Sequence, residues 1–226
     1  MFKYETHLHT LPVSKCARSS VSQTVEFYKS AGYDGIFLTN HFLDGYIDID
    51  PTLPYEERIN FYFGDYEEAK RIGDEIGLKV FCGVELSYGG TDFLVYGLGK
   101  EWFLEHPEIE GMKKSEELAL MASFGALIIQ AHPFRDANYI DHIRLYPKSV
   151  EGVEIYNGCR NDFENDMAKL YADHYGLIPL AGTDNHRAGL QKTFGGMESA
   201  TPVNSVEEFI AGVRNGSVIP FKTVIE

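Results

Sequence analysis

The chain is poor in cations and in cysteines, and both shortages exclude classes of protein. Of its 226 residues, 20 are Lys or Arg and 34 are Asp or Glu, which gives a formal net charge of −14. Such a chain is repelled by nucleic acid unless a basic patch intervenes, and no Lys/Arg cluster is visible, so we expect no nucleic-acid partner. The three cysteines form no CxxC pair and leave an odd number, which favours a reducing cytoplasm over a disulfide scaffold.

Long apolar runs and linkers are also missing from the sequence. No stretch approaches the roughly 20 apolar residues of a membrane helix, and the first residues lack the basic-then-apolar pattern of a signal peptide. We therefore expect a cytoplasmic protein that does not enter a membrane. No Pro/Ser-rich linker or solenoid repeat divides the sequence, so we predict one domain over residues 1–226. The 44% of hydrophobic residues is ample for a core.

Short apolar runs alternate with amphipathic segments along the chain. Six runs have the length and β-branched content of buried parallel strands: 35–39, 78–86, 93–98, 126–131, 152–156 and 177–183. Five helix-like segments end at glycines: 20–32, 66–77, 115–125, 161–176 and 205–216. Three of them open with serine caps, Ser20, Ser115 and Ser205. This alternation predicts an α/β fold with a parallel sheet, of which a closed barrel is one form.

Two histidines flank a single leucine in the stretch YETHLHT, residues 4–10. In a strand, residues i and i+2 point the same way, so His7 and His9 would project together. Two neutral imidazoles on one side are well placed to hold one metal ion. Two ordinary histidines near a chain end would show the same letters, so the rest of the chain has to decide.

Polar residues also follow the other apolar runs. Runs further along the chain deliver, at or near their ends, His41, Glu85, His132, Asp184 and His186. In a parallel α/β barrel these ends meet on one face, and the residue types are those that bind Zn, Mn or Fe. Each residue alone fits a cap, an ion pair or a turn, but five of the eight histidines at strand ends favour a metal site. The other three are predicted to be surface residues: His106, His142 and His174.

The motifs THLHT, TNH, GVE, AHP and GTDNH occur in this order, and the ordered set resembles the PHP (polymerase and histidinol phosphatase) family. The resemblance extends from His7 to His186. It implies a distorted (β/α)7 TIM-like barrel with two to three divalent ions, Zn, Mn or Fe, at the C-terminal mouth. The family includes phosphoesterases, histidinol phosphate phosphatases and domains attached to bacterial DNA polymerases.

The resemblance also implies which residues hold each ion. One ion would be held by four residues: His7, His9, Glu85 and Asp184. Glu85 would bridge to a second ion, which His132 also binds. A third ion would rest on His41 and His186.

The chain departs from this pattern in three places. Many relatives have another His or Asp soon after the first motif, whereas here Cys16 offers a thiolate as an extra ligand and Lys15 an anion contact. Asn40 replaces the acid of the usual Thr-Asp-His motif. Asp92 stands where relatives often have a histidine, and it is a further candidate ligand. We therefore expect two tightly held ions and a weaker third.

Arginines beside the metal motifs indicate the substrate. Arg135 and Arg160 each follow a predicted strand end, Arg18 follows the first motif, and Arg187 follows the last. Guanidinium groups match the oxygens of a phosphate ester. We expect a small phosphorylated substrate, contacted by Lys15, Arg18, Arg135 and Arg160.

These features together predict a metal-dependent phosphoesterase that hydrolyses a small phosphate monoester, with histidinol phosphate as one candidate. Metal-bound hydroxide would attack phosphorus while the ions and Arg135 or Arg160 hold the non-bridging oxygens, and Asp184 or His186 would assist the leaving group. Two other classes stay open. One is an amidohydrolase-like amide or ester hydrolase, in which a carboxylated lysine often stands in place of Glu85. The other is a PHP module that binds metal without turnover.

Overall fold

A nine-stranded mixed sheet organises the chain, and the computed structural model describes residues 1–224 of it. The strands are β1 (Phe2–Glu5), β2 (Gly35–Leu38), β3 (Lys79–Tyr88), β4 (Thr91–Tyr96), β5 (Leu127–Ala131), β6 (Gly152–Asn157), β7 (Ile178–Gly182), β8 (Thr193–Ser199) and β9 (Val218–Val224). Their order across the sheet is β7-β6-β5-β4-β3-β2-β1-β8-β9. All six predicted runs form strands, so the α/β class is confirmed.

Strand direction decides where the strand ends gather. Strands β1, β2 and β3 are parallel, as are β5, β6 and β7. Strand β4 runs against both β3 and β5, which leaves β3 and β5 pointing the same way. Six strands therefore place their carboxyl ends on one side of the sheet. The prediction that residues 93–98 form a parallel strand was wrong, because Gly89 and Gly90 both have positive φ and turn the chain back in a two-residue hairpin.

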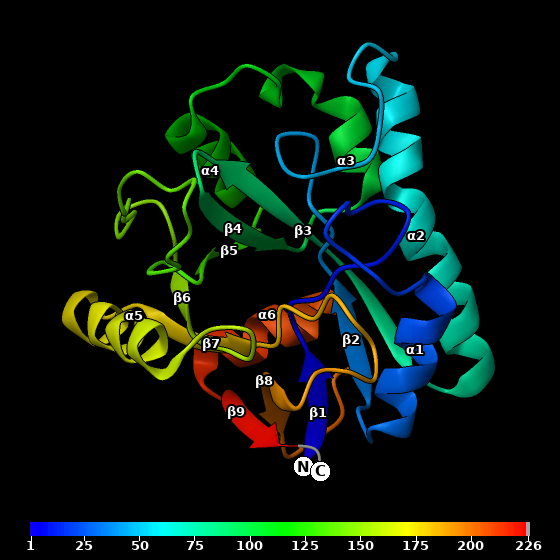
Figure 1. The fold of residues 1–226 in the computed structure, drawn as a ribbon, viewed down its shortest axis with the longest axis vertical. Coiled ribbons are helices and arrows are strands. Elements are labelled where there is room, and N and C mark those ends of the chain that lie inside the picture. The colour runs from blue at the N-terminus through cyan, green and yellow to red at the C-terminus, as the bar shows by residue number, and fades with distance from the viewer. Residues whose placement is uncertain (225–226) are drawn as a thin grey trace.

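The sheet curls until its two ends meet (Figure 1). Strand β7 packs beside β8 and β9, although no strand pairing joins them within residues 1–224. A hydrogen bond from the Gly195 amide to the Thr183 hydroxyl, 3.1 Å long, spans the gap. The result is a nearly closed, barrel-like sheet. The two antiparallel strands β4 and β8 interrupt the regular repeat, so the finer (β/α)7 pattern of the prediction is not followed.

Most helices cover the outside of the sheet, while the last one packs across one end of it. The helices are α1 (Val21–Ser30), α2 (Tyr55–Ile76), α3 (Lys100–Glu105), the 3₁₀ turn η1 (Pro107–Ile109), α4 (Lys114–Ser123), α5 (Asp162–Tyr175) and α6 (Val206–Asn215). Figure 1 shows α1 and α2 side by side on one flank and α5 on the other. Ser20 and Ser205 cap their helices as predicted, whereas α4 begins at Lys114, one residue before the expected Ser115.

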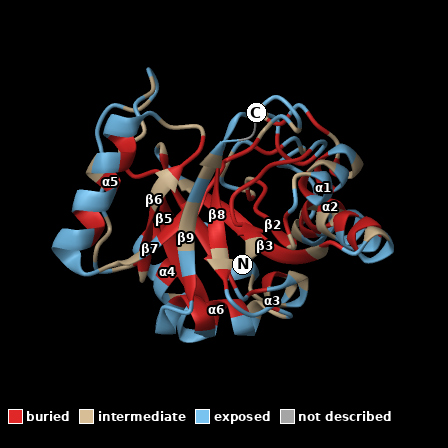
Figure 2. Cartoon of the chain, turned by 90° about the horizontal axis from the view of Figure 1, so that it is seen from below, coloured by how far each residue is buried: buried red, intermediate tan, exposed pale blue. Residues whose placement is uncertain are grey.

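Burial is concentrated in the strands. Figure 2 shows the strands mostly in the colour of buried residues, while the outer faces of the helices are exposed. Aromatic side chains fill the space between the sheet and α6, with Phe37 in contact with the rings of Phe81, Tyr96 and Phe209. This packing makes a rigid base under the side of the sheet where the parallel strands end.

The helices of residues 1–224 are short or polar, and none of them is both long enough and apolar enough to cross a membrane.

Candidate metal centre

The seven residues predicted to bind metal meet at the side of the sheet where the parallel strands end. His7 and His9 follow β1, His41 follows β2, and Glu85 lies within β3. His132 follows β5, and Asp184 and His186 follow β7. The reasoning from strand direction is confirmed, since residues up to 179 positions apart in sequence converge on one place.

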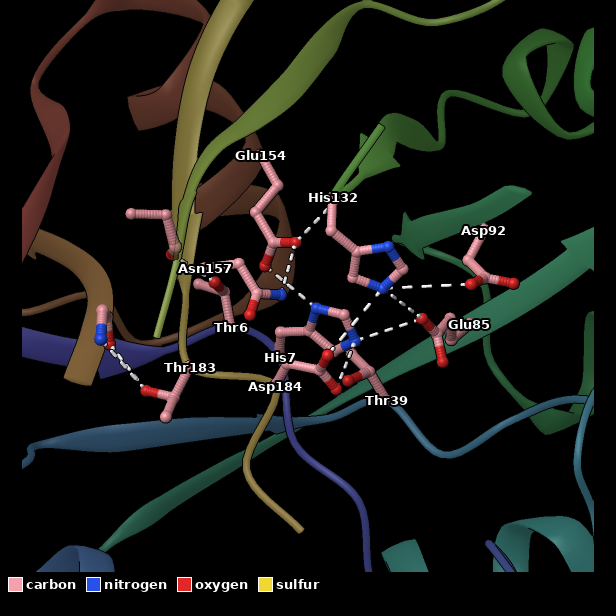
Figure 3. Close-up of polar contacts among 12 residues, drawn as sticks. Thr6, His7, Thr39, Glu85, Asp92, His132, Glu154, Asn157, Thr183 and Asp184 are labelled. Carbon is pink, nitrogen blue, oxygen red and sulfur yellow. Dashed lines mark hydrogen bonds and ion pairs between the residues drawn. The ribbon is translucent and has the colours of Figure 1, made fainter. Parts of the chain in front are cut away.

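Five of these residues form a buried cluster that we call the inner group: His7, His9, Glu85, His132 and Asp184. Figure 3 shows the Glu85 carboxylate beside the rings of His7 and His132. Glu85 Oε1 is 3.2 Å from His7 Nε2 and 3.4 Å from His132 Nε2. Asp184 Oδ1 is 3.2 Å from His9 Nε2 and 3.5 Å from His7 Nε2.

Three residues form a second cluster, nearer to solvent, that we call the outer group: Cys16, His41 and His186. Their ligand atoms and one nitrogen of His9 all lie within 4.8 Å of one another. The other oxygen of Glu85, Oε2, is 2.6 Å from His41 Nδ1 and 3.5 Å from His9 Nε2. Glu85 therefore faces both groups, and the candidate ligand Cys16 is brought to the outer one.

The atoms that meet in the inner group are placed as ligands of divalent ions rather than as hydrogen-bond partners of one another. The Nε2 atoms of His7, His9 and His132 and both oxygens of Glu85 are buried, yet none of them has a hydrogen-bond partner among residues 1–224. Ligand atoms bound at about 2.0–2.1 Å in a tetrahedral shell lie roughly 3.4 Å apart. Five nitrogen-to-oxygen separations in the group, 3.2–3.5 Å, agree with that value, while His132 Nε2 and Asp184 Oδ2 are 3.9 Å apart. Buried lone pairs that face each other are costly unless a cation lies between them.

A buried carboxylate on β6 orients His7. Glu154 Oε1 lies 2.9 Å from His7 Nδ1, so Nδ1 carries the proton and Nε2 presents its lone pair to the inner group. Glu154 Oε2 accepts from the His132 amide at 3.0 Å and from Asn157 Nδ2 at 2.9 Å. Sequence reasoning missed Glu154, although a carboxylate inside the apolar run 152–156 was a visible signal.

A second buried carboxylate, Glu5, ties the loops after β1 and β7 together. Its Oε1 accepts from the amides of Thr6, His7 and Thr183 at 2.8–2.9 Å. Its Oε2 accepts from the Tyr28 hydroxyl at 2.9 Å. Burial raises the pKa of Glu5 to about 7, although these donors act in the opposite direction. Glu5 was also missed, and its only signal was its place two residues before His7.

The backbone is constrained at two of the ligands. His132 and Asp184, with φ of 26° and 60°, are the non-glycine residues of the described chain that have positive φ. Such conformations are uncommon for residues with a Cβ and persist where the surroundings impose them. Here they turn two side chains inward just after β5 and β7.

The charges of the centre influence one another strongly. Burial lowers the pKa of His9 to about 3, with His186 and His41 acting in the same direction. Burial alone would raise the pKa of Glu85, but His41 and His7 hold it well below its ordinary value. Burial also opposes ionisation of Asp184, whose pKa is nevertheless well below its usual range beside His7 and His186. Burial alone would lower the pKa of His7, but Glu154, Asp184 and Glu85 raise it well above its ordinary value. The carboxylates of the centre thus stabilise positive charge, which protons on the imidazoles or a divalent cation between them can supply.

A cavity of about 700 Å³ opens above the two groups, and two arginines line it. Arg135 Nη2 lies 2.9 Å from Asp92 Oδ2, and its guanidinium stacks over the Tyr139 ring. Arg160 forms no ion pair with any residue of 1–224, and its buried Nε has no partner. Both arginines therefore reach the cavity as predicted.

Other predicted residues lie elsewhere or are already engaged. Lys15 pairs with Asp48 at 3.6 Å, outside the cavity. Arg18 donates to the carbonyls of Lys15 and Ala17 and lines a separate, more open groove with Arg187. The loop after β1 directs Lys15 and Arg18 away from the cavity. The expectation that these two residues contact the substrate there is therefore not supported. Asp92 Oδ2 lies 3.9 Å from His132 Nε2, beside the inner group, but it is paired with Arg135.

The three remaining histidines are not part of the centre. His142 and His174 are exposed, as predicted, while His106 is half-buried and lies 2.8 Å from Glu108. None of them belongs to a cluster of possible metal ligands among residues 1–224.

Comparison with solved structures gives the class of fold: the chain has the fold of PHP-like metal-dependent phosphoesterases and of related hydrolases. Comparison with protein-family profiles and with curated proteins finds no match. The similarity in structure is therefore accompanied by low sequence identity, and it establishes the fold alone.

Three structures illustrate the range of these relatives. A two-domain protein from Bacteroides vulgatus, containing a predicted PHP-like metal-dependent phosphoesterase, has a TM-score of 0.68 and 14% identity over 97% of this chain. An amidohydrolase from Chromobacterium violaceum has a TM-score of 0.57 and 13% identity, covering 93% of this chain and 96% of that one. The lesion-specific endonuclease EndoQ from Pyrococcus furiosus has a TM-score of 0.58 and 13% identity over 100% of this chain. This chain spans 64% of the Bacteroides protein and 59% of the endonuclease.

Proposed function

We propose that the chain is a metal-dependent phosphoesterase that hydrolyses a small phosphate monoester. The observation that carries the proposal is the position of Arg160, a guanidinium without an ion pair among residues 1–224, in the same cavity as two clusters of convergent ligand atoms. Metal ligands alone would suit many hydrolases. A cation beside them supplies the partner that a phosphate oxygen needs.

Two divalent ions would be held by the inner group, and a third by the outer group. Glu85 would serve more than one ion, because Oε1 faces His7 and His132 while Oε2 faces His9 and His41. When bound, such ions lower the pKa of a coordinated water and stabilise charge on phosphoryl oxygens. Zn, Mn and Fe are the candidates, and the thiol of Cys16 favours a soft ion such as Zn in the outer position.

The arginines would hold the non-bridging oxygens of the phosphoryl group. Asp92 and the Tyr139 ring keep the Arg135 guanidinium in one orientation, which reduces the entropy lost when it binds an oxygen. Arg160 brings the charge that is not neutralised by a partner. Together they would place the phosphoryl group beside the inner group.

Asp184 and His186 have different roles in this proposal. His186 Nδ1 donates to the Asp184 carbonyl at 2.7 Å, so its Nε2 is left for the outer group. His186 is thereby better suited to ion binding than to protonating a leaving group. Asp184 presents carboxylate oxygens to His7 and His9 and can accept a proton from the attacking water.

A small substrate suits both the size and the charge of the molecule. The cavity volume of about 700 Å³ lies in the range of small-molecule pockets. Exposed Tyr46 and Tyr139 stand at its rim. The net charge of −14 disfavours nucleic acid, so this chain is not expected to share the substrate of the endonuclease relative. Histidinol phosphate remains one candidate, and a cytoplasmic location remains an expectation.

Amide or ester hydrolysis is the main rival, and the amidohydrolase relative supports it at the level of the fold. Within the described residues, no lysine lines the cavity, so Glu85 takes the place that a bridging carboxylated lysine would need. A module without turnover is the other rival. The presence of a complete inner group argues against it.

The test is a substrate panel with a matched inactive variant. The purified chain, loaded with Mn, Zn or Fe in parallel, is given phosphate monoesters, phosphate diesters, carboxylic esters and amides. We expect turnover of monoesters that Glu85→Gln abolishes, which also controls for contaminating phosphatases. Turnover of amides or carboxylic esters alone would replace the proposal with the amidohydrolase alternative, and no turnover with any metal would leave a binding module.

A further inference from the structure

A chain of buried polar residues runs from helix α2 to His9, outside the cavity. Its members are Asp65, Thr10, Asn40 and Ser14, and all four are buried. None of them lines the cavity. Buried polar groups of this kind need complete hydrogen bonding. It can therefore be derived which atom donates and which accepts in each hydrogen bond.

The direction begins at Asp65. Its Oδ2 accepts from the Thr10 hydroxyl at 2.7 Å and from Asn40 Nδ2 at 3.1 Å. An ionised carboxylate has no proton to donate, so the amide nitrogen of Asn40 must face it. The Thr10 backbone N–H donates to Asn40 Oδ1 at 2.7 Å, which requires the same orientation of the amide. Asn40 Oδ1 is therefore an acceptor on the side away from Asp65.

Ser14 carries this direction on to His9. Its hydroxyl donates to Asn40 Oδ1 at 2.8 Å, and a hydroxyl has only one hydrogen. Its oxygen must therefore accept from its two other neighbours, the His41 amide at 3.0 Å and His9 Nδ1 at 3.3 Å. It follows that Nδ1 of His9 carries the hydrogen, and that Nε2 presents its lone pair to Glu85 and Asp184.

We propose that Asp65 is a positioning residue of the metal centre, which acts through Asn40 and Ser14 to fix the tautomer of His9 and the place of the His41 backbone. The inference rests on the proposed metal centre, since a fixed tautomer matters only if Nε2 of His9 binds an ion. Glu154 orients His7 through one direct hydrogen bond. Asp65 orients His9 in the same way but through two intermediate residues, Asn40 and Ser14. Contacts of this outer kind typically change metal affinity by about 10- to 100-fold.

Three variants test whether the hydrogen bonds from Asp65 to His9 have the derived donors and acceptors. Asp65→Leu keeps a similar volume but removes the oxygen that accepts from Thr10 and Asn40, and Ser14→Ala removes the acceptor of His9 Nδ1. Each should weaken zinc binding by about 10- to 100-fold, measured by competition with a chelator. The double variant Asn40→Asp with Asp65→Asn exchanges amide and carboxylate and again gives each donor an acceptor. It should recover most of the affinity.

Tyr62→Phe is the matched control. Tyr62 lies on the same helix and donates to the Asn40 backbone carbonyl at 2.8 Å, but it takes no part in the chain that leads to His9. This variant should lower the melting temperature and leave zinc affinity within about twofold of the parent. If Asp65→Leu and Ser14→Ala behave as Tyr62→Phe does, the four residues only support the fold and the inference is wrong. Failure of the double variant to recover affinity would overturn it as well.

The tautomer can be observed directly. In ¹⁵N spectra of the zinc-loaded parent, His9 should carry its proton on Nδ1, with its signal assigned from a His9→Gln variant. A proton on Nε2 would contradict the inference. Because the parent is measured first, a parent that binds no zinc would defeat the metal centre itself, whereas normal binding by the parent and by both single variants would defeat only the role of Asp65.

Discussion

The inner and outer groups of the centre are built from similar residues but are held in different ways. In the inner group, the His7 ring is oriented by Glu154 and the His9 ring by Ser14, and all five side chains are buried. In the outer group, the side chain of His186 is 26% exposed and Cys16 is half-buried. Pre-organised, buried ligands hold an ion without further ordering, whereas partly exposed ligands must be ordered when the ion binds.

This difference indicates a division of labour. If the proposed function holds, the buried inner group would keep its ions throughout a reaction. The outer group faces the cavity, where its ion would share the space with the phosphate. Glu85 contacts both groups, so its replacement should weaken metal binding in both of them.

Glu85→Gln should produce the largest effect. The parent should carry at least two ions per chain, and loss of the shared charge should weaken binding in both groups. Activity should fall by about 10³-fold or more. Elemental analysis and kcat/KM measure the two effects. Glu117→Gln is a suitable control, because it removes the charge of another buried carboxylate, which is paired with Lys114 at 2.6 Å and does not line the cavity. Normal metal content in Glu85→Gln would mean that Glu85 is structural.

Replacing either arginine should separate substrate binding from ion binding. Arg160→Ala and Arg135→Ala should each lower kcat/KM for a phosphate ester by about 10²-fold, because each removes a charged contact to the phosphoryl group. Metal content should stay normal in both. Arg18→Ala, whose guanidinium lies outside the cavity, should behave as the parent. If all three variants match the parent, phosphate loses its best local support.

Glu154→Gln tests whether the inner group depends on its oriented histidine. The neutral amide weakens the hold on His7 Nδ1, so inner-group affinity should fall by about 10- to 100-fold. A chelator titration that reports each ion separately measures this. The outer ion should be released at the same chelator concentration as in the parent. Equal weakening of all ions would show that the two groups are not independent.

Cys16→Ala should have the smallest effect and should be confined to the outer group. Loss of the thiolate leaves imidazoles and the shared Glu85 oxygen for the third ion, and its affinity should fall by about tenfold. In the parent, this ion should be the first released, and added phosphate should strengthen it. Release of all ions together, with or without phosphate, would show that the two groups form one site.

Much of the metal centre was predictable because strand direction follows from the sequence pattern. Apolar runs that alternate with amphipathic segments indicate parallel strands, and the ends of parallel strands meet. That argument located His7, Glu85 and Asp184 correctly, together with the other ligands. It failed for residues 93–98, where the Gly89–Gly90 hairpin reverses the chain, although two adjacent glycines were a readable signal.

The residues that orient the ligands were not predictable in the same way. Asp65 lies in an ordinary helix, and nothing in its neighbourhood along the chain marks it. Glu154 stands out as a carboxylate inside an apolar run, but the run does not show which residue it contacts. The partners of Glu154 and Asp65 are His7 and Thr10, which are 147 and 55 positions away. Lys15 and Arg18 show the opposite error. They lie close to a candidate ligand motif in sequence and were therefore expected at the cavity, but their side chains turn away from it.

The sequence by itself determined the class of fold and which candidate metal ligands converge, because periodicity and strand order decide which residues reach one end of a sheet. Tertiary structure alone decided which carboxylates orient the imidazoles, which cations reach the cavity, and that Cys16 joins His41 and His186. Those outcomes depend on hydrogen bonds of a few ångströms between segments far apart in the chain. Their direction is settled only when packing brings donor and acceptor together.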